Sequence, residues 1–458
     1  MKSITNIFRI LTAGILMVMS ISCKKIIEID LPKNQLTDDK VFSDSTNAQA
    51  AITGIYINMM QSYSLDFCSG GLTTFNGMSA DELNQTNKNI NDEFYFNRIS
   101  STNSTNSYLW VSAFKYIYGA NACIEGIKRS KKITQKQKDH LFAEARFIRA
   151  FIYFYLANLY ENVPMIAGAD YQVNRQLSQS KLEDIYQFII EDLAFARLHL
   201  SKPLRSNIRP HYFAATALLA RVYLYQKNYL LAEQMSTEVI DEGGYTLEPT
   251  PATVFGGGSK ETIWALLPVI GGRATWEGYY HLPPGAFSVP RYVITELLWN
   301  SFAENDKRRV DWIGNNTVQG VQYKYINKYK LYAENPNLNE RYVMLRLGEQ
   351  FLIRAESRAS LSAFDKAESD INTIRKRAGL ESFNSNGKMQ SILKEIEIQR
   401  RLELMCEWGH RWFDLKRTKR IDEVLSKVKQ HWTPSASLYP IPQDELDNNP
   451  NLKQNPNY

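Results

Sequence analysis

The chain has 458 residues, of which 44% are hydrophobic and 22% charged, as in a soluble globular protein with one large core or two to three joined domains. Its formal net charge of +6 comes from basic residues scattered among 48 acids, without a sustained basic stripe, which argues against a nucleic-acid partner. Aromatic residues reach 12%, including 26 Tyr, a side chain that suits both a core and a surface for flat, amphipathic partners.

The amino terminus has the pattern of an export signal. Two basic residues precede an apolar run, Ile10–Ile21, that is too short to span a bilayer comfortably. A cysteine, Cys23, follows directly after Ser22, so cleavage before Cys23 and acylation of it would give a lipid-anchored protein. Lipoprotein signals usually carry an aliphatic residue three places before the cysteine, and here that residue is Ser20. The alternative is an ordinary secretory signal with an incidental cysteine.

We therefore expect a signal peptide over residues 1–22 and a lipidated, polar linker over residues 23–45. After this linker the sequence becomes strongly helical, with apolar residues at three- and four-residue spacing. The expected helices are Thr46–Tyr63, Tyr108–Arg129, Gln135–Leu159, Leu182–Leu200 and Tyr212–Gln226.

One spacing of small and aromatic residues occurs twice. It is found at Ala220, Tyr229 and Ala232, and again at Ala355, Phe364 and Ala367. Small residues let two antiparallel helices approach, and the aromatic residue fills the turn between them, as in a tetratricopeptide helix pair. Since about three stacked repeats are needed for a stable array, we expect three or four such pairs as the scaffold.

Residues 243–340 differ from the helical halves on either side. Glycine and proline are frequent, and only short strands such as Thr262–Val269 and Val321–Tyr325 interrupt the predicted loops. A second polar stretch expected to be irregular runs from Ser64 to Asn106. Loops this long inside a compact domain are commonly functional.

Signatures of catalysis and metal binding are absent from the sequence. It contains no His-Glu-x-x-His, no Gly-x-Ser-x-Gly and no strand followed by Gly-x-Gly-x-x-Gly. The cysteines after Cys23 are Cys68, Cys123 and Cys406, spaced too far apart for a zinc or redox motif, and nothing requires a disulfide. We predict no metal and no cofactor. The adjacent acids Asp81 and Glu82 remain open as a glycosidase pair, because sequence gives no separation between their carboxyl groups.

Four segments together resemble the SusD and RagB family of outer-membrane nutrient-binding lipoproteins. They are Phe142–Ile166, with its Glu-Ala-Arg helix closing on Val-Pro; Leu352–Arg377, the second repeat; Ile398–Thr418, with Gly-His-Arg-Trp-Phe-Asp-Leu; and Leu438–Tyr458, with Tyr-Pro-Ile-Pro and Asn-Pro-Asn-Leu-Lys-Gln-Asn-Pro-Asn-Tyr. We expect Arg411, Trp412 and Asp414 to lock the last helix pair to the body by an arginine–carboxylate fork beside a buried indole. Pro440 and Pro442 predict an extended strap.

The resemblance implies a mostly α fold, with tetratricopeptide-like helix pairs as the scaffold and a loop-rich insertion of short strands. A single domain would cover residues 46–458. Within it we expect helical repeats at 46–242 and 341–420, the insertion at 243–340 and the strap at 431–458. The resemblance also implies a lipid-anchored protein of the outer membrane that captures oligosaccharides for a SusC-like TonB-dependent transporter.

Sugar rings present apolar CH faces that stack on aromatic rings, while their hydroxyls need polar partners. The expected ligand-binding residues are Trp276, Tyr279, Tyr280, Trp312, Phe94, Tyr95, Asp81, Asn84 and Arg273. Three other interpretations stay open: the same scaffold binding peptides or glycoprotein fragments, as the RagB branch implies, a glycoside hydrolase in a helical fold, and a structural adaptor in the periplasm.

Overall fold

The computed structural model describes residues 41–62, 64–202, 207–335 and 339–458. The expected signal peptide, Cys23 and most of the linker lie outside the described residues. Within them, no helix combines the length and the apolar character that a membrane crossing needs.

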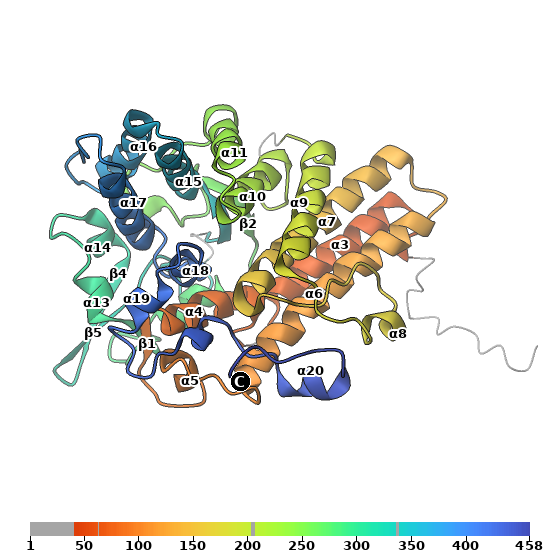
Figure 1. Ribbon diagram of the computed structural model, residues 1–458, viewed down its shortest axis with the longest axis horizontal. Helices are drawn as coiled ribbons and strands as arrows, with labels where there is room; N and C mark the ends of the chain where they lie inside the picture. Colours follow the sequence, from red (N-terminus) through yellow and green to blue (C-terminus); the bar gives the residue numbers. More distant parts are fainter. Residues whose placement is uncertain (1–40, 63, 203–206, 336–338) are drawn as a thin grey trace, which may run out of the picture.

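The helices expected in the first half are present, with ends that shift by a few residues. They are α3 (Ser45–Met60), α6 (Ser104–Arg129), α7 (Gln135–Tyr160), α9 (Leu182–His199) and α10 (Tyr212–Tyr225) (Figure 1). Helix α7 begins at a capping box in which Thr134 and Gln137 each bond the other's backbone N–H, and this pairing fixes its start.

Helix α7 is the central helix of this half. It packs against α6 on one side and α9 on the other, and every residue from Phe147 to Ala157 is buried. Arg149 lies in this run, and its guanidinium forks the Asp192 carboxylate of α9, with Nε–Oδ2 at 2.8 Å and Nη2–Oδ1 at 2.9 Å. The charge is therefore tolerated in the core because both of its bidentate positions are filled.

The two copies of the repeated spacing form helix pairs, as predicted. Helix α10 packs against α11 (Tyr229–Glu242), and α15 (Leu347–Ser360) packs against α16 (Phe364–Arg377). In both pairs the aromatic residue of the pattern is the first residue of the second helix. The alanines of both copies are fully buried, which lets the helices approach closely.

The insertion between the helical halves contains short strands and single-turn helices. Strand β2 (Thr262–Leu266) pairs with β6 (Tyr342–Arg346), and β4 (Ile313–Val318) forms a hairpin with β5 (Val321–Ile326). A third two-stranded ladder joins β1 (Leu83–Gln85) to β3 (Tyr292–Ile294). The short helices are η3 (Pro251–Thr253), α12 (Trp276–His281), α13 (Glu296–Trp299) and α14 (Lys307–Asp311).

The expectation of an irregular stretch from Ser64 to Asn106 is wrong for part of its length. A π-helical turn, η2 (Phe67–Gly71), leads into α4 (Leu72–Ser79), and α5 (Asp92–Tyr95) follows. Every residue of η2 and α4 is buried, although the sequence is rich in Thr, Ser, Gly and Asn. A helix covered on all sides has no apolar stripe, so the periodicity that reveals a surface helix is missing.

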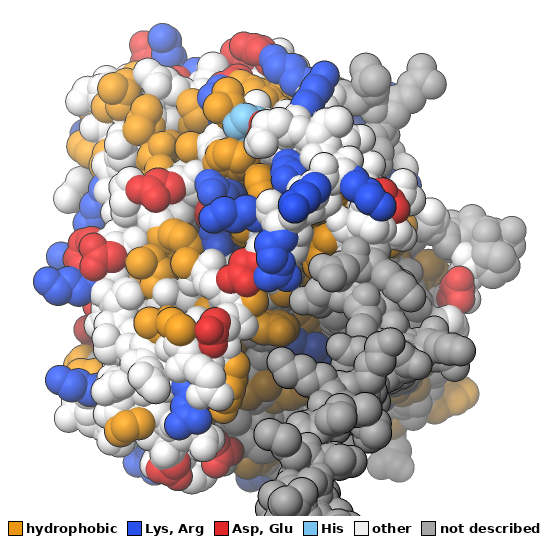
Figure 2. Space-filling model, turned by 90° about the vertical axis from the view of Figure 1, so that its right-hand side faces the viewer, with side chains coloured by type: hydrophobic (Ala, Val, Ile, Leu, Met, Phe, Trp, Pro, Cys, Tyr) orange, Lys and Arg blue, Asp and Glu red, His pale blue; other side chains and the backbone are white. Residues whose placement is uncertain are grey.

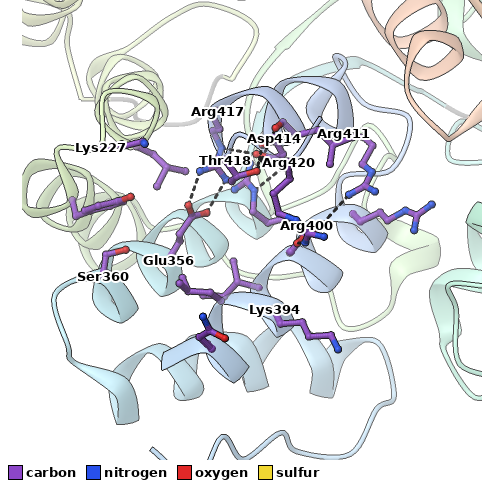
Figure 3. Close-up of a pocket in the computed structure, with 18 of the residues that line it drawn as sticks. Lys227, Glu356, Ser360, Lys394, Arg400, Arg411, Asp414, Arg417, Thr418 and Arg420 are labelled. Carbon is purple, nitrogen blue, oxygen red and sulfur yellow. Dashed lines mark hydrogen bonds and ion pairs between the residues drawn. The ribbon is translucent and has the colours of Figure 1, made fainter. Parts of the chain in front are cut away.

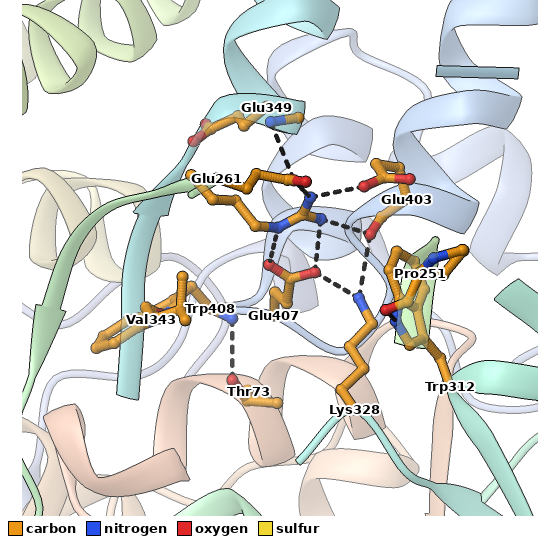
Figure 4. Close-up of polar contacts among 12 residues, drawn as sticks. Thr73, Pro251, Glu261, Trp312, Lys328, Val343, Glu349, Glu403, Glu407 and Trp408 are labelled. Carbon is orange, nitrogen blue, oxygen red and sulfur yellow. Dashed lines mark hydrogen bonds and ion pairs between the residues drawn. The ribbon is translucent and has the colours of Figure 1, made fainter. Parts of the chain in front are cut away.

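A buried charge network joins the insertion to the carboxyl-terminal helices (Figure 4). The Arg346 guanidinium donates to Glu403 at 2.6 Å, to Glu407 at 2.8 Å and to Glu261 at 2.9 Å. Lys328 of the insertion donates to the Glu403 carbonyl at 3.1 Å. Burial by itself would raise the pKa of Glu403, but the surrounding arginines hold it well below its usual range. Insertion and helices are thus tied by paired charges.

The carboxyl-terminal part completes the body. Helix α17 (Met389–Glu403) is followed by α18 (His410–Arg417) and α19 (Ile421–Leu425), and the strap carries η4 (Pro434–Ser437) and α20 (Gln443–Asn448). The strap is extended where two prolines fix it: the Tyr439 N–H donates to the Leu159 carbonyl at 3.0 Å, and Asn106 donates to the Pro440 carbonyl at 2.8 Å. The chain end is thereby fastened to α6 and α7.

Figure 2 shows the side of the molecule that lies at the right of Figure 1, where Lys and Arg side chains gather among hydrophobic ones. The turn between α6 and α7 lies at this end. Its exposed basic residues include Lys128 and Arg129 in the last turn of α6, and Lys131 and Lys132 just after it. Cations at this position complement the negative end of the α6 dipole.

Candidate functional site

Helix α12 presents two tyrosines outward because its other residues are anchored inward. The Trp276 indole Nε1 donates to the Met60 carbonyl at 2.9 Å, and Glu277 accepts from Thr73 and Tyr342. On the next turn, His281 contacts Thr74 at 3.0 Å. With these side chains fixed against α3, α4 and β6, Tyr279 and Tyr280 are left half-buried on the outer side of α12.

Burial changes the protonation of the two inward titratable groups. It raises the pKa of Glu277 to about 7, although hydrogen bonds from Thr73 and Tyr342 oppose the shift. It lowers the pKa of His281 to about 3, so this histidine is neutral at physiological pH. Neither group faces the outer side of α12, and both serve to hold the helix.

Three half-buried tyrosines form what we call the tyrosine platform: Tyr279, Tyr280 and Tyr332. The Tyr279 and Tyr332 ring centroids lie 5.0 Å apart with an interplanar angle of 35°, and Tyr280 meets Tyr279 edge to face at 5.2 Å. Such rings present both flat faces and hydroxyl groups to a partner.

Two arginines flank the tyrosine platform. The Arg273 guanidinium lies 4.0 Å from the Tyr279 ring centroid, and that of Arg291 lies 4.8 Å from the same ring and 5.4 Å from Tyr280. Hydrogen bonding from Arg291 lowers the pKa of Tyr279, and the positive charge of the arginine acts in the same direction. The two guanidinium groups keep the rings in place and add donors at their edge.

The β1–β3 ladder brings a distant segment to this surface. Asn84 of β1 pairs with Val293 of β3, and the Thr86 N–H donates to the Arg291 carbonyl at 3.0 Å. Asn84, which is half-buried, therefore lies on the strand beside the one that follows Arg291. Phe287, in the loop before β3, is 90% exposed.

Several side chains that the sequence indicated as ligand-binding are brought together here, and others lie in the interior. Tyr279, Tyr280 and Arg273 meet at the tyrosine platform, and Asn84 lies on the adjoining ladder. Tyr95 is half-buried on another part of the surface, where the Lys429 ammonium lies 4.1 Å from its ring centroid.

Four of the indicated side chains are buried. Trp312 is fully buried, and its Nε1 donates to the Pro251 carbonyl at 2.8 Å (Figure 4). Phe94 is also fully buried and stacks on Phe75 at 4.7 Å. Trp276 is 2% exposed and Asp81 4%. These four side chains are part of the core under the loops. Neither the three aromatic rings nor the Asp81 carboxylate is open to a ligand in this structure.

The neighbouring acids Asp81 and Glu82 have opposite pKa shifts. Burial opposes ionisation of Asp81, but Arg401 and Arg411 lower its pKa to about 2. Burial and the Asp81 charge raise the pKa of Glu82 to about 8. Two neighbouring carboxyl groups, of which Asp81 is ionised and Glu82 protonated at neutral pH, would suit glycoside hydrolysis. Glu82, however, is 1% exposed and its carboxylate accepts the Cys406 N–H, so the geometry is that of a packed core.

Tyr332 and Arg291 lie beside Tyr279 on the tyrosine platform and its flank, but the sequence did not indicate them. Both lie in the loop-rich segment 243–340, which the sequence did single out. Nothing in the sequence pairs them with α12, since their approach depends on the chain path between β2 and β6. No group of three His, Cys, Asp or Glu side chains in the part of the chain that the structure describes is arranged to hold a metal ion.

Comparison with known proteins gives two family matches that do not overlap. A model described as the SusD family matches residues 290–458, and one described as starch-binding associating with outer membrane matches residues 32–224. Among curated proteins, SusD-like protein P2 of Formosa agariphila is 27% identical, over 93% of this chain and 95% of the relative. The starch-binding protein SusD of Bacteroides thetaiotaomicron is 30% identical over 32% of this chain and 26% of its own length.

The fold is also similar to solved structures. A structure described as a laminarin binding SusD-like protein superposes with a TM-score of 0.77 and 24% identity, over 91% of this chain and all of that chain. The mostly α fold with paired helices, expected from the sequence, is thereby confirmed.

Proposed function

The chain belongs to the SusD/RagB family, and on that premise we propose that it binds carbohydrate at the cell surface as a lipoprotein. In this proposal it captures oligosaccharides at the tyrosine platform and delivers them, without chemical change, to a SusC-like TonB-dependent transporter of the outer membrane. Acylation of Cys23 is the proposed anchor, and the polar residues after it separate the folded body from the lipid surface.

The single observation that carries the carbohydrate proposal is the half-buried pair of tyrosines on the outer side of α12. Their rings are held by Arg273 and Arg291 and backed by Tyr332, so little conformational entropy is lost when a flat partner stacks on them. Sugar rings offer apolar CH faces for that stacking, and the arginines and tyrosine hydroxyls can meet the sugar hydroxyls. The relatives described as starch-binding and laminarin-binding support the same ligand class.

Titration calorimetry with neutral oligosaccharides tests the proposal. The purified protein should bind a β-glucan or α-glucan oligosaccharide, and Tyr279→Ala should weaken that binding. Tyr171→Ala is the matched control, because Tyr171 is 69% exposed on α8 (Tyr171–Asn174), away from the insertion. Binding of a peptide panel without any response to sugars would contradict the proposal and favour the peptide-binding interpretation.

Absence of catalysis and the surface location have tests of their own. Prolonged incubation with a bound oligosaccharide should release no new reducing ends, since Asp81 and Glu82 are packed in the core. Steady release that disappears in Glu82→Gln would contradict this. On intact cells, added protease should cleave the protein, whereas an adaptor facing the periplasm would stay protected.

A further inference from the structure

A large cavity lies among the carboxyl-terminal helices, separate from the tyrosine platform. Its volume is about 780 Å³, and its walls come from α15, α17, α18, α19 and the turn between α10 and α11. No residue of the tyrosine platform lines it. The close-up shows Arg400 in the middle of the lining residues, between Lys394 on one side and Asp414 and Arg417 on the other (Figure 3).

Arg400 has hydrogen-bonding capacity that the described part of the chain does not use. It is 2% exposed, and its Nε donates to Asp414 at 2.8 Å. Its two terminal nitrogens, Nη1 and Nη2, are buried and have no hydrogen-bond partner in the described structure, so a ligand reaches them only when the side chains that cover them move. These are the two nitrogens of the guanidinium fork that can bind both oxygens of one planar carboxylate.

The carboxylates near Arg400 are already engaged by other cations. Asp414 also accepts from Arg417 Nε at 2.7 Å, and Glu356 is held by Arg417 Nη2 at 2.7 Å. Glu397 pairs with Arg411 and Arg420. Asp414 therefore binds Arg400 only through Nε, and among the described residues no lining carboxylate bonds the two terminal nitrogens of Arg400.

The cavity as a whole favours an anion. Among the described residues, seven Lys or Arg side chains and four carboxylates line it, and Asp81, which lies outside the lining, pairs with two of the seven, Arg401 and Arg411. Lys227 and Lys394 are exposed at its rim and add positive charge where a ligand would enter. An excess of positive charge beside a buried, unpaired guanidinium is the electrostatic arrangement of an anion site.

The remaining lining is suited to a sugar. Ser360, Gln390, Thr418 and Tyr229 supply hydroxyl and amide groups, and Leu393 supplies an apolar wall. Hydroxyl and amide groups exchange hydrogen bonds with sugar hydroxyls. The lining carboxylates can accept hydrogen bonds from such hydroxyls.

We propose that this cavity is a second binding site, which takes a uronic acid residue with its carboxylate on the Arg400 fork. Lys394 and Lys227 attract the anion, and the hydroxyl and amide side chains hold the sugar ring. The choice of a sugar as the bearer of the carboxylate rests on the proposed function, but the anion site itself is independent of the tyrosine platform.

Titration of the purified protein with sodium D-galacturonate and with trigalacturonate tests this proposal, with galactose as the neutral counterpart. We expect binding of the uronates and none of galactose at the same concentration. Lys394→Ala should weaken uronate binding by about threefold to tenfold, through loss of one rim charge. Lys366→Ala is the matched control, because Lys366 is an exposed lysine of α16 outside the cavity, and it should leave the affinity unchanged.

Arg400→Lys keeps the positive charge beside Asp414 but removes the fork, so it should weaken uronate binding by about tenfold to a hundredfold. Its thermal midpoint reports whether the fold survives; if the variant does not fold, the Lys394→Ala and Lys366→Ala pair decides the question alone. Uronate binding that both Lys394→Ala and Arg400→Lys leave unchanged would overturn the proposal. So would preferential binding of inorganic sulfate or of an acidic dipeptide over the uronate.

Failure of this proposal and failure of the proposed function can be told apart. Loss of uronate binding in Arg400→Lys with neutral oligosaccharide binding intact supports two separate sites. If Tyr279→Ala abolishes uronate binding and Arg400→Lys does not, the uronate binds at the tyrosine platform and the cavity proposal is wrong. If neutral glycans do not bind at all but uronate binding depends on Arg400, only the tyrosine platform proposal is wrong.

Discussion

Arg411 forks the carboxylate of Asp81 across 330 residues of sequence, with Nε–Oδ1 at 2.8 Å and Nη2–Oδ2 at 3.0 Å. Arg401 adds a bond to the same carboxylate at 2.8 Å. The predicted lock of the last helices to the body therefore exists, but its acceptor lies next to β1 and not within the signature. Asp414 of the signature binds Arg400 and Arg417 instead. Beside the lock, the Trp412 indole is fully buried.

Asp81→Asn should destabilise the protein by about 3–5 kcal/mol, because it removes the counter-charge of the half-buried Arg401 and leaves the buried Arg411 only its longer contact with Glu397. Urea unfolding followed by circular dichroism measures the free energy change. Glu423→Gln is the control: its ion pairs with Arg420 and Lys427 are exposed, and the substitution should cost less than about 1 kcal/mol. Equal effects of the two substitutions would contradict a structural role for Asp81.

The stability of the protein should fall as pH rises from 4.5 towards 8, in part through Glu82. Burial raises the pKa of Glu82 from 4.5 to about 8, so the folded state holds a proton that the unfolded state releases. Its contribution is complete below pH 4.5 and is lost as pH passes the folded pKa. Glu82→Gln, which cannot ionise, should flatten the thermal midpoint against pH over that window. A slope identical to that of the unmodified protein would refute this assignment.

Trp312→Ala should reduce stability and not ligand affinity directly. The indole is fully buried, with Lys328 4.2 Å from its ring centroid, so truncation leaves a large cavity and costs about 3–5 kcal/mol. Thermal unfolding measures the loss. A variant with an unchanged midpoint and weakened glycan binding would instead place this ring in the binding site.

Tyr279→Ala should weaken ligand binding without lowering stability, the opposite of Trp312→Ala. The ring is half-buried at the surface, so its removal should leave the thermal midpoint nearly unchanged while weakening oligosaccharide binding by about 1 kcal/mol or more. Calorimetric titration gives the affinity, with Tyr171→Ala as the control described above. An affinity equal to that of the unmodified protein would remove Tyr279 from the site.

Ala355→Leu should destabilise the α15–α16 pair by about 1–3 kcal/mol, since Ala355 is fully buried and a larger side chain must push the helices apart. Urea unfolding provides the measurement. Ala50→Leu, on the exposed side of α3, should change stability by less than about 0.5 kcal/mol. If both substitutions were neutral, the close helix approach would not depend on small residues.

The helices of the scaffold were predictable because they are long and one-sided. A stripe of apolar residues repeats along α6 and α9, and the Ala-aromatic-Ala spacing is sufficient to mark α10–α11 and α15–α16 as helix pairs. Helix α4 was missed for the converse reason, since all of its residues are buried and no stripe exists.

The candidate site was predictable only in part. Composition indicated the insertion and its aromatic residues, among them Tyr279 and Tyr280, which the structure places on the tyrosine platform. Whether a given ring faces solvent depends on where its hydrogen-bonding atom finds a partner. Trp276 and Trp312 each donate an indole N–H to a backbone carbonyl far away in sequence, from Met60 and Pro251, and both rings therefore turn inward.

Sequence by itself determined the class of fold and the paired helices, and it predicted the strap and the segment in which a ligand site would lie, because these follow from local periodicity and from motifs carried along the chain. Tertiary structure alone decided which aromatic and charged side chains are open. Asp81 is paired with Arg411, whereas the two terminal nitrogens of Arg400 have no partner among the described residues. Both outcomes depend on how segments far apart in the sequence pack together. Exposure is a property of what packs above a side chain, and that neighbour is fixed only when the whole chain has folded.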